Sequence, residues 1–319
     1  MSNSEPHSAA APRRAHLDDL DLPQGKRARL HTLLYEHGPA NGTLLMLPLD
    51  QGLEHGPVDF FANPPAVDPD FEVQLALKGN YSGIALQIGL AKRYLHQVAG
   101  RLPLVLKING RTTPPGFDEA FSPLTSSVED AVRLGAAAVG YTCYVGSPAQ
   151  DRDLRQMNEV RQECDRYGMP LICWAYPRGA AIAKKGGQDS LYAIDYAARV
   201  AAEMGADVIK LNIPREHSEA DSASPAPYDT LVEDRRQMLT RIIRSAGRSV
   251  VIFAGGSKLG DDELLGRIDD CMAAGATGFI FGRNMWQRPL PAALDMTQRV
   301  HKVLQRYGDQ QLPPGSPKY

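Results

Sequence analysis

The chain has few cysteines, and their spacing argues against two kinds of cross-linked fold. The four are Cys143, Cys164, Cys173 and Cys271. No two of them form a C-x-x-C motif, and no histidine-rich segment accompanies them. This pattern disfavours a structural zinc site and a disulfide framework. We expect a cytoplasmic protein with reduced thiols.

Long hydrophobic runs and an excess of charge of one sign are also absent. No apolar run approaches the roughly 20 residues of a membrane span. Residues 1–24 carry charged side chains and lack the apolar stretch of a secretory signal. The formal net charge of −2 provides no basic field for nucleic acid or for a membrane surface. We therefore expect neither as a partner.

Short apolar runs alternate with helical stretches, which predicts a parallel sheet. Eight such units favour a closed (β/α)8 TIM barrel over a doubly wound sheet, and no G-x-G-x-x-G motif follows the first run to support dinucleotide binding. The predicted strands are Leu44–Leu49, Gly83–Gln87, Leu104–Ile108, Ala137–Tyr144, Leu171–Ala175, Val208–Ile213, Val250–Ala254 and Gly278–Phe281. Helices are predicted at Asp151–Tyr167, Leu191–Met204, Asp229–Arg244 and Leu290–Gln305.

No linker divides the chain, so we predict a single domain with two tails. The predicted parts are a flexible or docking tail at 1–24, the barrel at 25–306 and a second tail at 307–319. Long connections follow the first, third and sixth strands, at Glu54–Asp70, Asn109–Ser126 and His217–Tyr228. These connections begin at the C-terminal ends of the strands, where barrels of this type carry their active sites.

Lys210 lies in an apolar strand-like run, Ala206-Asp207-Val208-Ile209-Lys210-Leu211-Asn212-Ile213. Removing an ammonium group from water costs so much that a buried lysine lowers its pKa and loses its proton. A neutral amine can attack a carbonyl carbon and form a Schiff base. Alternatively, Lys210 only ends a strand and extends its ammonium group into solvent. The residues predicted to lie near Lys210 distinguish the reactive amine from the solvent-exposed one.

Three predicted strands bring polar or aromatic side chains to the same end of the barrel. Alternate residues of a strand share a face, which places Lys210 and Asn212 together on the sixth strand. The same spacing places Trp174 with Tyr176 on the fifth strand and puts Asp50 at the end of the first. Each of these residues alone is more often part of a core or a turn. Their convergence favours an active site.

The last two strands each run into glycine. Gly255 and Gly256 follow the seventh strand, and Gly282 with Arg283 follows the eighth, before a helix. Glycines let backbone N–H groups approach an anion, and a helix N-terminus adds partial positive charge. Alternatively, they only permit tight turns. A lysine amine beside such a phosphate site indicates a phosphorylated carbonyl substrate. No H-E-x-x-H or clustered His/carboxylate motif indicates a metal.

Five segments, spread in order over residues 47–289, resemble the archaeal-type class I fructose-1,6-bisphosphate aldolase family, which also has bacterial members. The segments are Leu47-Pro48-Leu49-Asp50-Gln51-Gly52-Leu53-Glu54-His55-Gly56-Pro57, Trp174-Ala175-Tyr176-Pro177-Arg178-Gly179, Gly205-Ala206-Asp207-Val208-Ile209-Lys210, Ala254-Gly255-Gly256-Ser257-Lys258 and Gly282-Arg283-Asn284-Met285-Trp286-Gln287-Arg288-Pro289. The resemblance implies metal-independent cleavage of fructose 1,6-bisphosphate, without a cofactor, through an imine.

The resemblance also implies roles for individual residues. Lys210 matches the Schiff-base lysine, Tyr176 the proton-transfer tyrosine, Asp50 the aspartate that positions the amine and the substrate hydroxyls, and Trp174 a pocket residue. The tyrosine pKa, ordinarily near 10, is expected to fall beside the cationic iminium. The phosphate of the dihydroxyacetone phosphate half is expected at Gly255, Gly256, Gly282 and Arg283. The second phosphate is expected at Arg178, with Lys184 and Lys258 as weaker candidates.

Two positions depart from the family pattern, and other functions stay open. Ala254 replaces a serine, and Asn212 replaces a second lysine of several relatives, which leaves Lys210 as the only amine on its strand. Related enzymes include a transaldolase-like synthase and a thiolase for a phosphorylated dione. A non-catalytic sugar-phosphate sensor is a further alternative. The resemblance also implies a homo-oligomer.

Overall fold

A computed structural model describes residues 14–309, which form a closed barrel of eight parallel strands. Each strand pairs with its neighbours in chain order, and β8 closes the barrel against β1. The strands are β1 (Leu44–Pro48), β2 (Gly83–Gln87), β3 (Leu104–Lys107), β4 (Ala138–Val145), β5 (Leu171–Pro177), β6 (Val208–Leu211), β7 (Val250–Ala254) and β8 (Gly278–Ile280). The predicted TIM barrel is confirmed.

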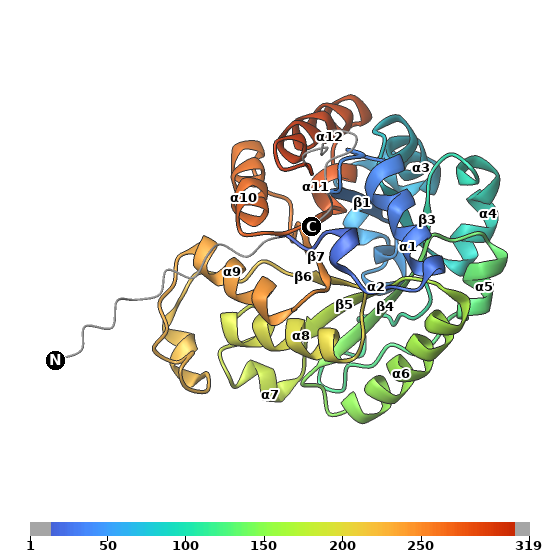
Figure 1. The fold of residues 1–319 in the computed structure, drawn as a ribbon. Helices are drawn as coiled ribbons and strands as arrows, with labels where there is room; N and C mark the ends of the chain where they lie inside the picture. The colour runs from blue at the N-terminus through green and yellow to red at the C-terminus, as the bar shows by residue number, and fades with distance from the viewer. Residues whose placement is uncertain (1–13, 310–319) are drawn as a thin grey trace.

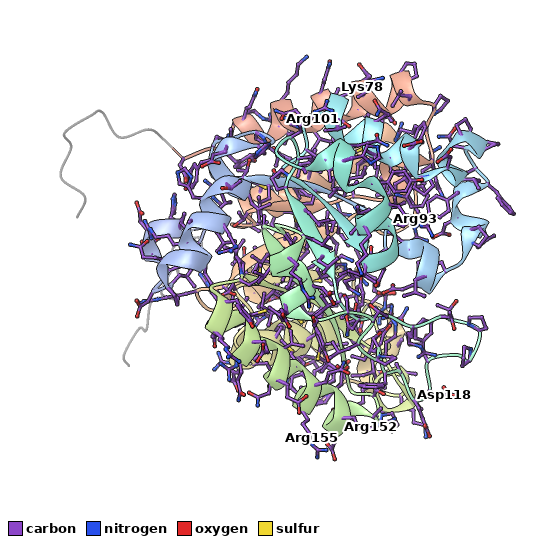
Figure 2. The ribbon with its side chains drawn as sticks, turned by 90° about the vertical axis from the view of Figure 1, so that its right-hand side faces the viewer. Lys78, Arg93, Arg101, Asp118, Arg152 and Arg155 are labelled. Atoms are coloured by element: carbon purple, nitrogen blue, oxygen red, sulfur yellow. The ribbon has the colours of Figure 1, made fainter. Side chains whose placement is uncertain are left out.

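Helices surround this barrel (Figure 1). The α-helices are α1 (Gln24–His31), α2 (Gln51–Glu54), α3 (Pro69–Lys78), α4 (Ile88–Val98), α5 (Val128–Arg133), α6 (Gln150–Tyr167), α7 (Ala180–Ala183), α8 (Leu191–Glu203), α9 (Arg235–Ser245), α10 (Asp261–Ala273), α11 (Arg283–Trp286) and α12 (Leu290–Gln305). The short turns are η1 (Leu17–Asp19), η2 (Thr32–Glu36), η3 (Pro57–Phe60), η4 (Pro64–Val67) and η5 (Glu219–Ala223). Charged side chains such as Lys78, Arg93 and Arg155 point away from the barrel (Figure 2). Within residues 14–309, no helix is both long and apolar enough to cross a membrane.

Alternation along the strands separates two buried clusters. Side chains such as Met46 and Val208 fill the inside of the barrel. Leu47 and Ile209 belong to the outer cluster, which packs under the helices. Lys210 follows Ile209 and therefore points inward, as the spacing of two residues per repeat predicts.

Several element boundaries differ from the predicted ones. β5 extends to Pro177 because all seven of its residues pair with β4. β6 ends at Leu211, so Asn212 lies just beyond the strand. Helix α9 begins six residues later than predicted, because Asp234 caps it. The Asp234 side chain accepts a hydrogen bond from the Gln237 N–H, and the Gln237 side chain accepts one from the Asp234 N–H.

The segment before β1 covers the N-terminal end of the barrel. Leu17 and Leu30 are buried in the cluster that fills the barrel. The Lys26 ammonium group lies 2.7 Å from a carboxylate oxygen of Asp165 and 2.9 Å from one of Asp207. Part of the predicted N-terminal tail, from residue 14 onward, therefore packs on the barrel. The domain boundaries themselves stay a prediction.

Candidate functional site

A cavity of about 290 Å³ opens at the C-terminal ends of the strands. All nine residues predicted for the site line it: Asp50, Trp174, Tyr176, Arg178, Lys210, Gly255, Gly256, Gly282 and Arg283. Ala254 and Asn212, the two departures from the family pattern, line it as well. The weaker candidates Lys184 and Lys258 do not. Lys258 instead donates a hydrogen bond to the carbonyl of Gln287.

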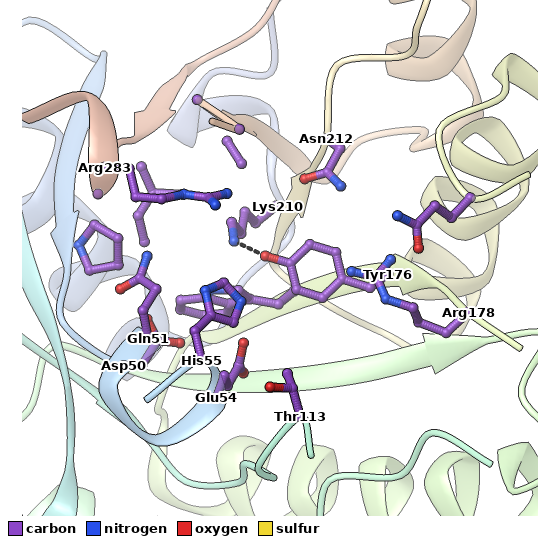
Figure 3. Close-up of a pocket in the computed structure, with 18 of the residues that line it drawn as sticks. Asp50, Gln51, Glu54, His55, Thr113, Tyr176, Arg178, Lys210, Asn212 and Arg283 are labelled. Atoms are coloured by element: carbon purple, nitrogen blue, oxygen red, sulfur yellow. Dashed lines mark hydrogen bonds between the residues drawn. The ribbon is translucent and has the colours of Figure 1, made fainter. Parts of the chain in front are cut away.

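Lys210 is a buried amine, and over residues 14–309 its Nζ has one hydrogen-bond partner. Only 5% of the residue is exposed, and its Nζ donates a hydrogen bond to the Tyr176 hydroxyl (Figure 3). Burial lowers the pKa of Lys210 from 10.5 to about 8, although the carboxylates of Asp50 and Glu54 act to raise it. A fraction of the amine is therefore uncharged at neutral pH, which is the form needed for attack on a carbonyl.

The Tyr176 phenol has the opposite shift. Burial raises its pKa well above the usual 10, and the negative charges of Glu54 and Asp50 raise it further. The phenol is therefore protonated in the free site. The lowering that we expect belongs to a state with a cationic imine beside the ring.

Asp50 and Trp174 complete the surroundings of the amine. Asp50 is 3% exposed and lies at the end of β1, where it precedes α2. The Trp174 ring centre lies 5.6 Å from the Lys210 Nζ and also 5.6 Å from the Nζ of Lys107. The indole fits there because β4 has a glycine beside it: a Cβ on Gly140 would lie 2.6 Å from the ring. Both lysine ammonium groups thus lie close to Trp174.

One end of the cavity is made of the two glycine loops. Their backbone N–H groups at Gly255, Gly256 and Gly282 have no hydrogen-bond acceptor among residues 14–309. Gly256 has a φ of +65°, which favours glycine. Asn284, 1% exposed, donates hydrogen bonds to the carbonyls of Gly255 (3.0 Å) and Ser257 (3.1 Å). It therefore holds the β7 loop against α11.

A free cation faces this loop. Arg283 makes no hydrogen bond or ion pair with any other residue in the described range. In Figure 3 its side chain extends over the cavity from α11, on one side of Lys210. The loops and Arg283 together provide donors and positive charge for an anion.

Two further arginines lie on the opposite side of the cavity. Figure 3 shows Arg178 beyond the Tyr176 ring from Lys210. The guanidinium groups of Arg178 and Arg111 each lie 5.1 Å from the centre of the Phe117 ring. Within the described part of the chain neither group has a carboxylate partner, and Arg111 Nη1 and Arg178 Nε are buried without a hydrogen bond. This end can also take an anion.

Comparison with known proteins identifies the family. A family profile described as "DeoC/LacD family aldolase" matches residues 44–288. The chain belongs to this family. The match covers all eight strands, from β1 to the residues after α11. Its class I members are aldehyde-lyases that form a Schiff base, and they are typically metal-independent.

Individual relatives of this aldolase agree with that placement. It is 34% identical to "Fructose-bisphosphate aldolase class 1" of Thermoproteus tenax over 77% of this chain and 84% of the relative. It is 31% identical to "2-amino-3,7-dideoxy-D-threo-hept-6-ulosonate synthase" of Halobacterium salinarum over 88% and 91%. A solved archaeal fructose-1,6-bisphosphate aldolase, with its catalytic lysine bound to a carbinolamine intermediate, superposes with a TM-score of 0.74. That structure is 30% identical and covers 88% of this chain and 100% of its own.

Three charged residues near the site of the aldolase were not among those predicted from the sequence. Lys107 stands in the apolar run Leu104-Val105-Leu106-Lys107-Ile108, and this is the same signal that singled out Lys210. Glu54 lies in the segment that carries Asp50. Because it follows the end of β1, the two-residue repeat of a strand does not predict where its side chain points. Arg111 lies in a loop, where no periodicity places a side chain. Over residues 14–309, no group of three or more His, Cys, Asp or Glu side chains is arranged to hold a metal ion.

Proposed function

We propose that this aldolase cleaves fructose 1,6-bisphosphate reversibly into dihydroxyacetone phosphate and glyceraldehyde 3-phosphate. The observation that carries the proposal is the buried amine of Lys210, hydrogen-bonded to Tyr176 in a cavity with an anion-binding end on each side. A ketose with a phosphate at both ends and a carbonyl between them has this distribution of charge. The name of the Thermoproteus tenax relative supports the same substrate.

Each end of the cavity suits one phosphate. Gly255, Gly256 and Gly282 offer backbone N–H groups and Arg283 a free guanidinium group for the phosphate on C1. Arg178 and Arg111 offer unpaired N–H groups for the phosphate on C6. Guanidinium groups pair well with phosphate because several donors point in one direction.

The reaction begins at the amine. Neutral Lys210 Nζ attacks the C2 carbonyl carbon, and protonation of the resulting carbinolamine hydroxyl lets water leave and an iminium form. A base then takes the C4 hydroxyl proton, the C3–C4 bond breaks, and its electron pair moves into the iminium to give an enamine. The aldehyde leaves, C3 takes a proton, and water releases dihydroxyacetone phosphate.

Tyr176 and Asp50 serve these steps in different ways. The Tyr176 hydroxyl touches the reacting nitrogen and is our candidate for proton transfer at C4 and C3. The iminium cation lowers the pKa of the phenol at the moment when a base is needed. Asp50 stabilises that cation and positions the substrate hydroxyls. Trp174 forms the wall behind the amine.

Chemical trapping tests the proposal. The enzyme is reduced with borohydride in the presence of dihydroxyacetone phosphate, and its peptides are mapped by mass spectrometry. We expect one adduct, on Lys210, and none in Lys210→Arg, which keeps the charge but also loses all cleavage activity. Lys258→Met, which changes an exposed lysine outside the cavity, is the control and keeps the adduct. No adduct on Lys210 in the wild type overturns the proposal.

A second candidate is a lysine-dependent synthase of the transaldolase type. The 31% identity to the Halobacterium salinarum synthase over 88% of this chain favours it. Cleavage assays with fructose 1,6-bisphosphate and fructose 1-phosphate separate the two functions. Adduct formation without cleavage of either sugar favours the synthase or the phosphorylated-dione thiolase. Phosphate binding without any adduct identifies a sensor.

A further inference from the structure

A second lysine lies beneath the cavity, and the reaction described above leaves it without a role. Lys107 on β3 is completely buried. Its Nζ donates a hydrogen bond to the carbonyl of Asn109 (2.8 Å) and lies 3.7 Å from a carboxylate oxygen of Glu54 and 3.9 Å from one of Asp50. A cation this deep is stable only beside negative charge.

The same two carboxylates also act on Lys210. Asp50 and Glu54 both raise the pKa of Lys210, whereas Lys107 lowers it. Asp50 and Glu54 lie within 4 Å of Lys107, and no carboxylate of the described residues lies that close to Lys210 Nζ. Lys107 is therefore closer than Lys210 to the two carboxylates, and it balances their negative charge. Without Lys107, Lys210 is the only buried ammonium group among residues 14–309 that remains at this end of the barrel to match it.

We propose that Lys107 is a positioning residue that pairs with Asp50 and Glu54 and thereby leaves the Lys210 amine uncharged and available for attack. The role assigned to Lys210 rests on the proposed function. Lys107 itself does not line the cavity and acts through the carboxylates. After imine formation Lys210 carries a positive charge whatever the pH, and the same carboxylates face that charge. Lys107 therefore acts on the preceding step, the attack of the neutral amine on the carbonyl carbon.

Other charged groups also face the amine and define what the experiment has to hold constant. Arg178 lowers the pKa of Lys210, and Tyr176 accepts its hydrogen bond. His55, Arg111 and Arg283 also line the cavity. None of these side chains lies within ion-pair distance of Asp50 or Glu54 over residues 14–309. Lys107 is therefore the cation whose removal changes the pairing of both carboxylates.

The test is the pH dependence of adduct formation in Lys107→Met, which removes the charge and keeps the length of the side chain. Borohydride trapping with dihydroxyacetone phosphate is measured from pH 5.5 to 10. In the wild type we expect the rate to rise with pH and to level off near the Lys210 pKa of about 8. In Lys107→Met we expect this midpoint to move up by about one pH unit. Trapping at pH 7 then slows by about tenfold and recovers at pH 10.

A double variant and a matched control separate charge from packing. Lys107→Met/Glu54→Gln loses one charge of each sign, so its midpoint should return toward that of the wild type, and it remains testable if the single variant does not fold. Lys26→Met removes another buried, ion-paired lysine at the opposite end of the barrel. We expect Lys26→Met to lower the melting temperature and to leave the midpoint unchanged.

The outcomes distinguish this inference from the proposed function. Two results overturn the positioning role and leave the proposed function intact. The first is a wild-type adduct on Lys210 with the same midpoint of trapping in Lys107→Met. The second applies if the single variant does not fold, and it is a midpoint of the double variant well above that of the wild type. Absence of any adduct in the wild type overturns the proposed function.

Discussion

At the scale of single residues, the two hydrogen-bonded groups at the centre of the site differ in what they contribute. Lys210 supplies the bond-forming nitrogen, and Tyr176 is proposed to move protons around it. The raised pKa of the free phenol keeps Tyr176 protonated until a cation forms beside it. Removing the hydroxyl and removing the amine should therefore have different consequences.

Tyr176→Phe is expected to keep the imine and lose turnover. Phenylalanine preserves the ring against Arg178 but cannot transfer a proton. We expect kcat for cleavage of fructose 1,6-bisphosphate to fall by about 10²–10⁴-fold, while borohydride still traps an adduct on Lys210. Normal turnover by Tyr176→Phe would show that another group transfers the proton.

Arg111→Met tests the far phosphate end. A hydrogen bond to a charged group contributes about 1.5–3 kcal/mol, so kcat/KM for fructose 1,6-bisphosphate should fall by about 10- to 100-fold. Fructose 1-phosphate lacks the phosphate on C6, and its kcat/KM should change little. Arg152→Met is the control, because Arg152 lies 4.9 Å over the Phe121 ring and outside the cavity. An equal loss with both sugars would contradict the assignment.

At the scale of elements, one helix of the barrel contains a buried carboxyl group that makes stability depend on pH. Helix α3 contains Glu72, which is completely buried and has no hydrogen-bond partner for either carboxylate oxygen among residues 14–309. Burial raises its pKa from 4.5 to about 8. The unfolded chain releases the Glu72 proton near pH 4.5, whereas the folded chain retains it up to about pH 8. Stability is therefore lost as the pH rises between these two values.

Glu72→Gln should remove that loss, because glutamine has a similar shape and does not titrate. We expect the variant and the wild type to melt at similar temperatures at pH 5. At pH 9 the variant should melt several degrees higher, since the wild type has to bury a charge. Thermal denaturation at both pH values checks this. A variant that is equally destabilised at both would point to packing.

At the scale of the whole molecule, the first and the last of the described residues, Arg14 and Asp309, meet at the N-terminal end of the barrel. The Asp309 carboxylate accepts hydrogen bonds from Arg14 and from the Tyr35 hydroxyl, and it lies 3.1 Å from the His16 Nδ1. The Asp309 N–H also donates to the Asn41 carbonyl just before β1. This cluster lies far from the cavity, so it should affect stability without affecting catalysis.

Asp309→Asn is expected to lower the free energy of unfolding by about 1–3 kcal/mol and to leave kcat and KM unchanged. Denaturant titration and the cleavage assay measure the two quantities. The double variant Arg14→Met/Asp309→Asn should lose less than the sum of the single variants, because both remove the same interaction. Strict additivity would indicate that the pair contributes little.

Several properties of the whole molecule stay predictions. The homo-oligomer, the cytoplasmic location, the lack of a nucleic-acid partner and the role of residues 307–319 rest on the sequence and on the resemblance. Most of this last segment lies outside the described residues. Size-exclusion chromatography with light scattering measures the oligomeric state directly.

The sequence alone determined where the eight strands lie, to within a few residues at their ends, and the inward face of β1, β5 and β6. A strand repeats every two residues, so the placement of Lys210, Tyr176 and Trp174 on one face follows from local spacing. The barrel itself follows from the order of strands and helices, and its known geometry brings Asp50 to the same end. Helix starts were less certain, because a single cap such as Asp234 decides them.

Only the tertiary structure decided which charges meet. Closure of the barrel places Lys107 of β3 beside the carboxylates that follow β1, and it brings Lys107 and Lys210 to the same Trp174 ring. The loop after β3 brings Arg111 and Arg178 to one ring, Phe117. Such contacts join segments far apart in the chain, and loop backbones have no period from which to derive them. Spacing thus predicts the nucleophile, and packing sets the charges around it.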